Sequence, residues 1–257
     1  MLRETVLSAV IAGLIAALAL TAMQAVWVTP LILKAETFER SGEMQLSHEH
    51  ASPTAAADER MLVAEHEHVS AHHDHGASTH HHDASEWKPR EGFQRTAFTF
   101  GANLLMSLGY AFVLTAVYLL WREPRSARWG AVYGIAGFIV FFAAPALGLP
   151  PELPGTAAAE LTVRQQWWIM VAGATGAGLL LLLSRIAWWA RVLGAALIVA
   201  PHFIPAPSPE AHSSLAPEAL QMQFRWATAL SNAVFWMLLG LTSAVALRKL
   251  VRLPSSP

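Results

Sequence analysis

Histidines crowd into one short stretch of this 257-residue chain. The chain has 12 histidines, and most of them lie between His48 and His82. Imidazole is a neutral nitrogen ligand near pH 7, and neighbouring carboxylates add oxygen ligands. Such a set suits borderline divalent metals such as cobalt, nickel, copper and zinc, without selecting one of them. The predicted metal ligands are His48, His50, His66, His68, His72, His73, His75, His80, His81 and His82.

These histidines belong to a polar segment, residues 34–91, that has no hydrophobic period. A segment of this kind cannot build a core, so we expect a disordered loop when no metal is bound. Membrane di-iron oxidases also use histidine clusters, but at fixed positions on rigid helices. Because the clusters here are repetitive and lie in a polar loop, the sequence predicts metal binding, and the chain is not expected to be an enzyme.

The composition of the whole chain is that of a membrane protein. Hydrophobic residues make up 54% and charged residues 14%, whereas a soluble chain has about a quarter charged residues. This balance argues against an ordinary soluble enzyme. A net charge of −1 gives no reason to expect nucleic-acid binding, and the lack of cysteine excludes disulfides, iron–sulfur clusters and cysteine-based zinc sites.

Six runs without any Asp, Glu, Lys or Arg predict an all-α, polytopic membrane helix bundle with six transmembrane helices, because about 18 apolar residues suffice to cross a bilayer. The runs are 5–33, 96–121, 129–151, 165–184, 192–209 and 226–247. The fifth is short and contains Pro201 and Pro205, so five spans are also possible. We therefore divide the chain into a first transmembrane helix (1–33), a His-rich extracytoplasmic loop (34–91) and a bundle of five further helices (92–257).

Basic residues predict the orientation, because Lys and Arg concentrate in cytoplasmic loops. With six spans and a cytoplasmic N-terminus, the inside receives Arg3, three arginines of residues 122–128, two of residues 185–191 and the basic tail at 248–252. Both termini are therefore expected in the cytoplasm, and the His-rich loop outside it. Small residues four apart, such as Gly130 with Gly134 and Ala174 with Gly178, predict close helix contacts.

Polar groups in or beside the apolar runs are the candidates for a translocation path, because such groups are costly in a membrane. Gln and Asn can equally serve as contacts between helices, and Glu160 could pair with Arg164 one helical turn away. His202 follows Pro201 in an apolar run, where it could be a ligand or a capping group. The candidates are Gln24, Glu36, Glu39, Asn103, Glu152, Glu160, Arg164 and His202.

Taken together, these motifs resemble the CbtA family, proposed cobalt transporter subunits of bacterial membranes. The resemblance covers nearly the whole chain and rests on residues 27–39, the His-rich loop, residues 87–96, and residues 145–155 with the Arg-Gln-Gln-Trp-Trp sequence at 164–168. Pro201-His202 and Phe235-Trp236 complete it. The resemblance implies cobalt uptake for cobalamin synthesis, five spans, and a CbtB-like partner with one span and its own His-rich tail.

Two functional hypotheses follow from these observations. The first is a membrane subunit of a transition-metal uptake system in the bacterial inner membrane, whose external loop collects the metal for passage through the bundle. Cobalt is the suspected cargo, with nickel, zinc and copper still open. The second is a membrane-anchored protein that binds, buffers or senses metal without transporting it. No nucleotide-binding P-loop is present in the sequence, so an ATP-driven step would need another subunit.

Overall fold

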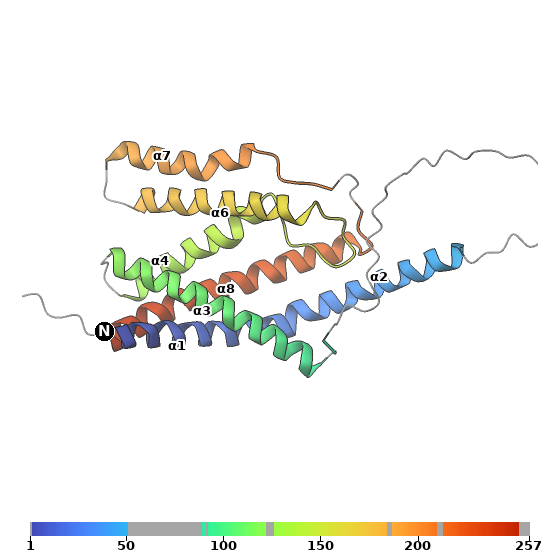
Figure 1. Cartoon of the computed structure of the whole chain (residues 1–257), viewed down its shortest axis with the longest axis horizontal. Coiled ribbons are helices and arrows are strands. Elements are labelled where there is room, and N and C mark those ends of the chain that lie inside the picture. The colour runs from blue at the N-terminus through green and yellow to red at the C-terminus, as the bar shows by residue number, and fades with distance from the viewer. Residues whose placement is uncertain are drawn as a thin grey trace, which may run out of the picture.

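The computed structural model describes residues 2–50, 89–90, 92–121, 126–183, 187–209 and 213–251, and within them the chain is built from helices (Figure 1). In chain order the elements are α1 (Leu2–Met23), the π-helix η1 (Gln24–Val28), α2 (Thr29–His50), α3 (Phe93–Trp121), α4 (Ala127–Phe138), the π-helix η2 (Ile139–Ala143), α5 (Ala144–Ala146), α6 (Leu161–Leu183), α7 (Trp188–Val199), the 3₁₀-helix η3 (Ala200–Phe203) and α8 (Glu218–Leu250).

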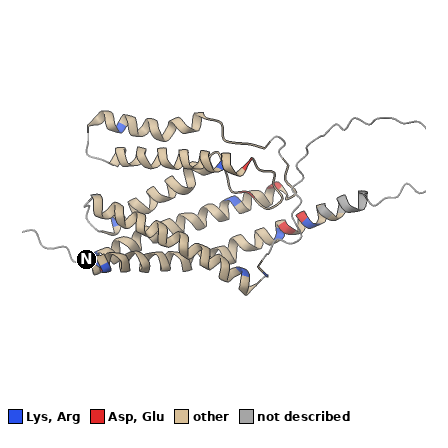
Figure 2. Ribbon diagram, in the orientation of Figure 1, with Lys and Arg blue, Asp and Glu red and all other residues tan. Residues whose placement is uncertain are grey.

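The helical membrane fold expected from hydropathy is confirmed. Within the described residues, five helical stretches are long and apolar enough to cross a membrane: Leu2–Gly42, Phe93–Leu120, Ala127–Ala146, Leu161–Leu183 and Glu218–Leu250. The predicted fifth span corresponds to α7, which has 12 residues and continues as η3. Figure 2 shows the charged residues toward the two ends of the bundle, with uncharged helix between them. With α7 included, α8 returns to the end at which α1 begins (Figure 1).

The main body packs α1, α3, α4 and α8 around one apolar core. Leu20, Tyr118 and Phe235 are among its largest fully buried side chains. Glycine allows the closest approach in this body, because a Cβ on Gly240 would collide with the backbone oxygen of Gly130. Small residues permit such contacts between membrane helices, where lipid gives no hydrophobic drive for association.

A second unit is the antiparallel pair of α6 and α7 (Figure 1). The two helices cross closely at Gly178 and Gly194, where a Cβ on either glycine would lie 2.5 or 2.7 Å from the backbone oxygen of the other. This pair meets the main body mainly through η2 and α5, where Trp167 and Val171 of α6 pack beside Ala144. The pair is therefore joined to the body near one end of α6.

Both π-helices come just before a proline. Pro30 follows η1 by two residues, and Pro145 follows η2 by two residues. A proline within a helix has no N–H to donate, and its ring clashes with the carbonyl four residues earlier. The wider π turn accommodates that clash without ending the helix. Near Pro201, by contrast, the α-helix does end: α7 stops at Val199 and the chain continues as η3.

The first helix extends much further than hydropathy suggested. We expected the polar loop to begin at Lys34, but α2 continues to His50. Hydropathy marks where a helix leaves the membrane, not where it stops. Residues such as Ala, Glu, Arg and Met favour helix in water as well, and the sequence from Ala35 to Gln45 is rich in them. His48 and His50 therefore lie on a helical backbone.

Candidate functional site

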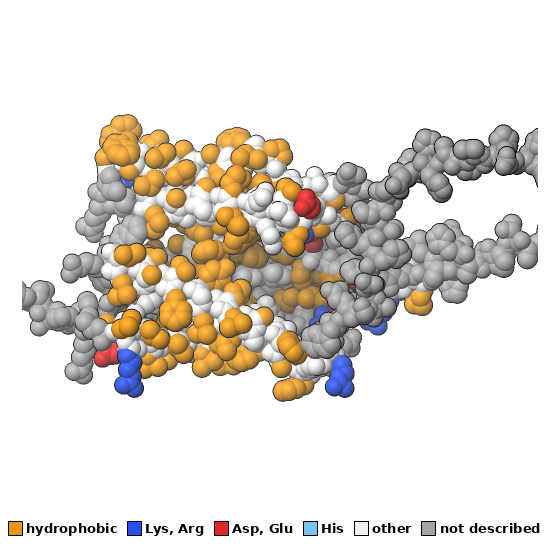
Figure 3. Space-filling view, viewed as in Figure 1, with side chains coloured by type: hydrophobic (Ala, Val, Ile, Leu, Met, Phe, Trp, Pro, Cys, Tyr) orange, Lys and Arg blue, Asp and Glu red, His pale blue; other side chains and the backbone are white. Residues whose placement is uncertain are grey.

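An open cavity of about 900 Å³ lies between the α6–α7 pair and the main body, at the end where α2 and α8 meet. The face drawn in Figure 3 is hollowed in this region. The N-terminal turns of α6 form one wall, η2 and α5 another, and the loop between α5 and α6 borders it. Its lining is largely aromatic, aliphatic and proline side chains, including Phe141, Phe142, Trp168 and Phe224.

Two opposite charges face each other in this lining. The guanidinium nitrogen Nη2 of Arg164 lies 3.6 Å from Oε2 of Glu152, and both side chains are about 30% exposed (32% and 28%). Arg164 belongs to the first turn of α6, where its backbone N–H donates to the carbonyl of Glu160 at 3.1 Å. Its charged partner is thus Glu152, not the Glu160 side chain suggested by helical spacing. The pair is loose and accessible, so either charge can meet a ligand.

The loop that carries Glu152 is held by a residue that sequence reasoning missed. The side chain of Gln221, in the first turn of α8, is buried. Its Nε2 donates to Thr156 Oγ1 at 2.7 Å and to Ser214 Oγ at 2.9 Å, and its Oε1 accepts from Leu153 N at 3.4 Å. Its amide therefore joins the loop before α6 to the segment before α8.

The loop itself has the residue types that its shape requires. Pro150, Pro151 and Pro154 restrict the backbone on both sides of Glu152. Gly155 has φ of 75°, a left-handed conformation that glycine adopts without strain. Nothing in the sequence distinguished Gln221 as a structural residue, because a glutamine in the first turn of a helix is usually exposed. Its role follows only from the pairing of Thr156 with Ser214.

A polar contact joins the first two spans inside the apolar region. Asn103 of α3 is only 7% exposed. Its Nδ2 donates to Oγ1 of Thr21 at 3.0 Å and to Oε1 of Gln24 at 2.7 Å. Gln24 is the first residue of the π-helix η1. The structure thus brings Gln24 and Asn103 together, and their hydrogen bond is a polar interaction at the end of α1, where α3 packs beside it.

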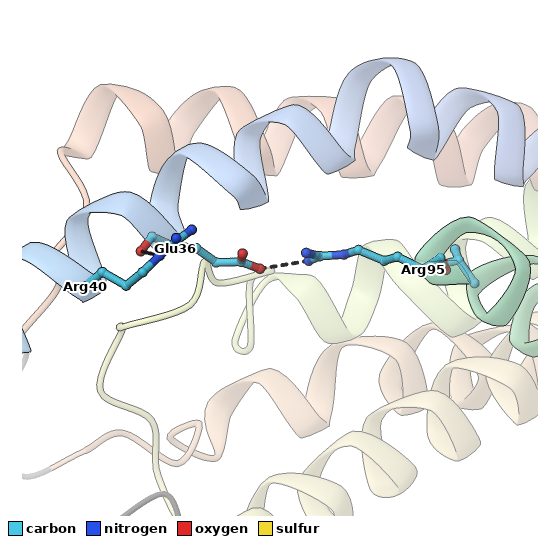
Figure 4. A network of polar contacts seen from close by, with 4 residues as sticks. Glu36, Arg40 and Arg95 are labelled. Atoms are coloured by element: carbon cyan, nitrogen blue, oxygen red, sulfur yellow. Dashed lines mark hydrogen bonds and ion pairs between the residues drawn. The ribbon is translucent and has the colours of Figure 1, made fainter. Parts of the chain in front are cut away.

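An ion pair lies beyond this contact, toward the polar end. Arg95 of α3 donates from Nη2 to Oε1 of Glu36 in α2 at 2.8 Å, and the two side chains point toward each other in Figure 4. Arg40 also donates from Nε to the backbone oxygen of Glu36, at 3.3 Å. A small cavity of about 140 Å³ lies between these helices, lined in part by Thr21, Thr29, Arg95, Thr96 and Thr99.

The remaining predicted residues are dispersed. Glu39 lies on α2, one turn beyond Glu36; Glu160 is exposed, and His202 of η3 is partly exposed. Neither Glu160 nor His202 is among the residues that line the 900 Å³ cavity. His66, His68, His72, His73, His75, His80, His81 and His82 lie outside the described residues. In the described ranges, no three His, Cys, Asp or Glu side chains group closely enough to hold a metal ion.

Apolar helices of membrane length, charges at their ends and a cavity that opens at one end define a polytopic helical membrane protein. Comparison with known families identifies it further. Residues 2–248 match the CbtA family, described as a probable cobalt transporter subunit, and the chain belongs to that family. The description is one of a transporter subunit, not of an enzyme, and names cobalt as the cargo. No curated protein and no solved structure matches the chain.

Proposed function

We propose that this chain is the membrane subunit of an uptake system for a divalent transition metal, with cobalt as its cargo. Histidines between His48 and His82 collect the metal outside the membrane, and the helix bundle passes it inward. Family membership supports cobalt as the cargo. The repeated imidazoles support collection of a borderline divalent metal, because such ions favour nitrogen ligands.

The observation that carries this proposal is the position of the 900 Å³ cavity. It opens at the end of the bundle where α2 leads into the His-rich segment and α3 leads out of it (Figure 1). Its charged pair, Glu152 and Arg164, comes from the two motifs that are most distinctive in the sequence, at 145–155 and 164–168. A metal released by the histidines would thus meet a carboxylate at the mouth of the cavity.

The proposed inward route uses the polar groups of the otherwise apolar helices. Glu36 and Glu39 lie on the polar part of α2, and Gln24 with Asn103 lies between α1 and α3. Glu160 and His202 stand near the outer ends of α6 and α7. Such groups are costly in a membrane unless they bind a partner or a substrate. A π-helix at Gln24 supports a ligand role there, because π turns often occur at functional sites.

The same proposal includes an orientation and a partner. Both described ends of the chain lie at the same end of the bundle (Figure 1), and Arg248 and Lys249 follow the apolar part of α8. The positive-inside tendency then assigns that end to the cytoplasm of a bacterial inner membrane. A small, single-span, His-rich protein of the CbtB type is the proposed partner, handing metal to or from the external histidines.

Substitution of Glu152 tests this proposal. Bacteria that lack their own cobalt uptake would carry the wild-type chain, Glu152→Gln or the control Glu218→Gln, whose carboxylate is exposed in the first turn of α8. Radioactive cobalt is measured in cells washed with a chelator. We expect Glu152→Gln to lower internal cobalt several-fold and the control to match the wild type. Cobalt that binds to the cells but is fully removed by the chelator would support a metal-buffering or sensing protein instead.

A further inference from the structure

The 900 Å³ cavity is much larger than a metal ion needs. An ion with six bound waters occupies about 180 Å³, since each water takes about 30 Å³. Sites for small organic molecules have volumes of about 300–1,000 Å³ and are lined mainly by apolar and aromatic groups with a few polar ones. The cavity has this character, with Phe141, Phe142, Trp168 and Phe224 in its lining.

The polar groups in the lining also suit an organic ligand. Arg164 presents a planar guanidinium, which binds carboxylates in a bidentate manner. Its present partner, Oε2 of Glu152, is 3.6 Å away, and both groups are partly exposed. An incoming carboxylate can therefore replace Glu152 at Arg164 without breaking a tight, buried pair. Glu152 would then be free to face a positive charge a few ångströms away.

A metal chelated by amino acids carries both the carboxylate that Arg164 can bind and the positive charge that Glu152 can face. Its carboxylates are anionic, its centre is cationic, and its organic part is apolar or aromatic when the amino acid is histidine. The aromatic rings of Phe141 and Trp168, on η2 and α6, could pack against an imidazole ring. A hydrated ion offers no apolar surface to these rings and would have to shed its waters against them. The apolar wall thus favours the chelate over the hydrated ion.

We propose that the cavity takes its divalent metal as a chelate with a small amino acid of the histidine type, whose carboxylate binds Arg164. This inference rests on the proposed transport function and specifies the form of its substrate. It also accounts for the loose Glu152–Arg164 pair, which holds the two charges in place while the cavity is free and separates when the chelate enters. The external histidines and the chelate then compete for one metal, so free amino acid would draw metal from the loop into the cavity.

The test uses the full chain, purified and placed in lipid nanodiscs. Cobalt(II) with excess radioactive L-histidine is added under nitrogen, and the retained histidine is counted with and without cobalt. We expect cobalt-dependent retention in the wild type and at least tenfold less in Arg164→Gln, because charge-assisted hydrogen bonds contribute about 1.5–3 kcal/mol. Arg225→Gln is the matched control, since Arg225 is exposed on α8. Glu152→Gln, which preserves side-chain size, should also weaken retention.

Three results would overturn the inference. The first is histidine retention that does not depend on cobalt. The second is equal retention in Arg164→Gln, Glu152→Gln and the wild type, which would mean that the chelate is bound by the external histidines and not in the cavity. The third concerns cells: internal cobalt that rises with the chain but falls when histidine is added would show that the free ion is the substrate. That third result would leave the proposed uptake function standing, whereas no chain-dependent uptake of either form would remove both.

Discussion

Replacing Gln221 with leucine should open the loop that carries Glu152 while leaving the helices in place. Leucine keeps most of the volume but none of the three hydrogen bonds to Leu153, Thr156 and Ser214. A hydrogen bond contributes about 0.5–1.5 kcal/mol net, and a buried donor left without a partner costs about 1–3 kcal/mol. Losing two short bonds and leaving the Leu153 N–H unpaired should therefore destabilise the closed loop by about 2–6 kcal/mol.

A thiol probe can measure this opening, because the native chain has no cysteine. Ala216 is 5% exposed and packs in the same cluster as Leu153 and Leu220. A cysteine placed there should react with a maleimide only when the loop opens, so its labelling rate follows the open population. Since about 1.4 kcal/mol corresponds to a factor of ten, Gln221→Leu should speed labelling by at least about 30-fold and by up to about 20,000-fold.

The matched control is Gln223→Leu, two residues further along α8, where the side chain is exposed. It makes the same chemical change outside the hydrogen-bond cluster and should leave the labelling rate within about threefold of the parent. Labelling of the Gln221→Leu protein at the parent rate would refute the reasoning. It would mean that packing of Leu153 and Phe224, and not the Gln221 amide, keeps the loop closed.

Further predictions concern the helix contacts and the proposed route. Gly194→Ala would place a Cβ 2.7 Å from the oxygen of Gly178 and should lower the free energy of unfolding of the purified protein by about 1–3 kcal/mol. The control Gly173→Ala, whose Cβ would meet nothing within 4 Å, should leave the stability unchanged. Equal effects of the two substitutions would contradict the close crossing of α6 and α7. Asn103→Leu removes two contacts between helices and should cost about 1–2 kcal/mol as well as lower cobalt uptake per folded copy; unchanged uptake per copy would limit Asn103 to packing. His202→Ala should sharply reduce uptake at normal membrane levels, and His202→Gln should be nearly as damaging, so full rescue by glutamine would remove His202 from the route. Deleting residues 48–82 should weaken metal capture at low supply but not uptake at high supply, and capture by the intact chain should fade as the pH falls through about 6.5, where imidazoles become protonated; loss of uptake at every concentration in the deletion would make the loop part of the pathway.

The helical membrane fold could be predicted from the sequence because it depends on local composition. Charge-free runs marked the spans, and Pro201 marked the end of α7. The extension of α2 to His50 was not accessible from the same signal, since hydropathy reports the surroundings of a helix and not its length. Pro30 and Pro145 were visible in the sequence, but whether each would end a helix or widen it into a π turn depended on the packing around it.

The sequence predicted the residues of the candidate site one by one, but not the contacts between them. Gln24 and Asn103 were both selected as polar groups in apolar runs, but their contact depends on how α1 packs against α3. Helical spacing suggested Glu160 as a partner for Arg164, whereas the stiff loop brings Glu152 instead. Gln221 carried no local signal, because two of its three partners, Thr156 and Leu153, lie 65 and 68 positions away. Contacts at such separations follow from the tertiary fold alone.

The most direct test of the central claim is the accumulation of radioactive cobalt by bacteria that lack their own uptake system. Cells would carry this chain, the small His-rich partner, both or neither, and would be washed with a chelator that does not enter them. We predict that internal cobalt rises when the chain and partner are present together, and that the partner alone produces no rise. Internal cobalt that is the same in all four strains, with only chelator-removable cobalt increasing, would contradict transport by this chain.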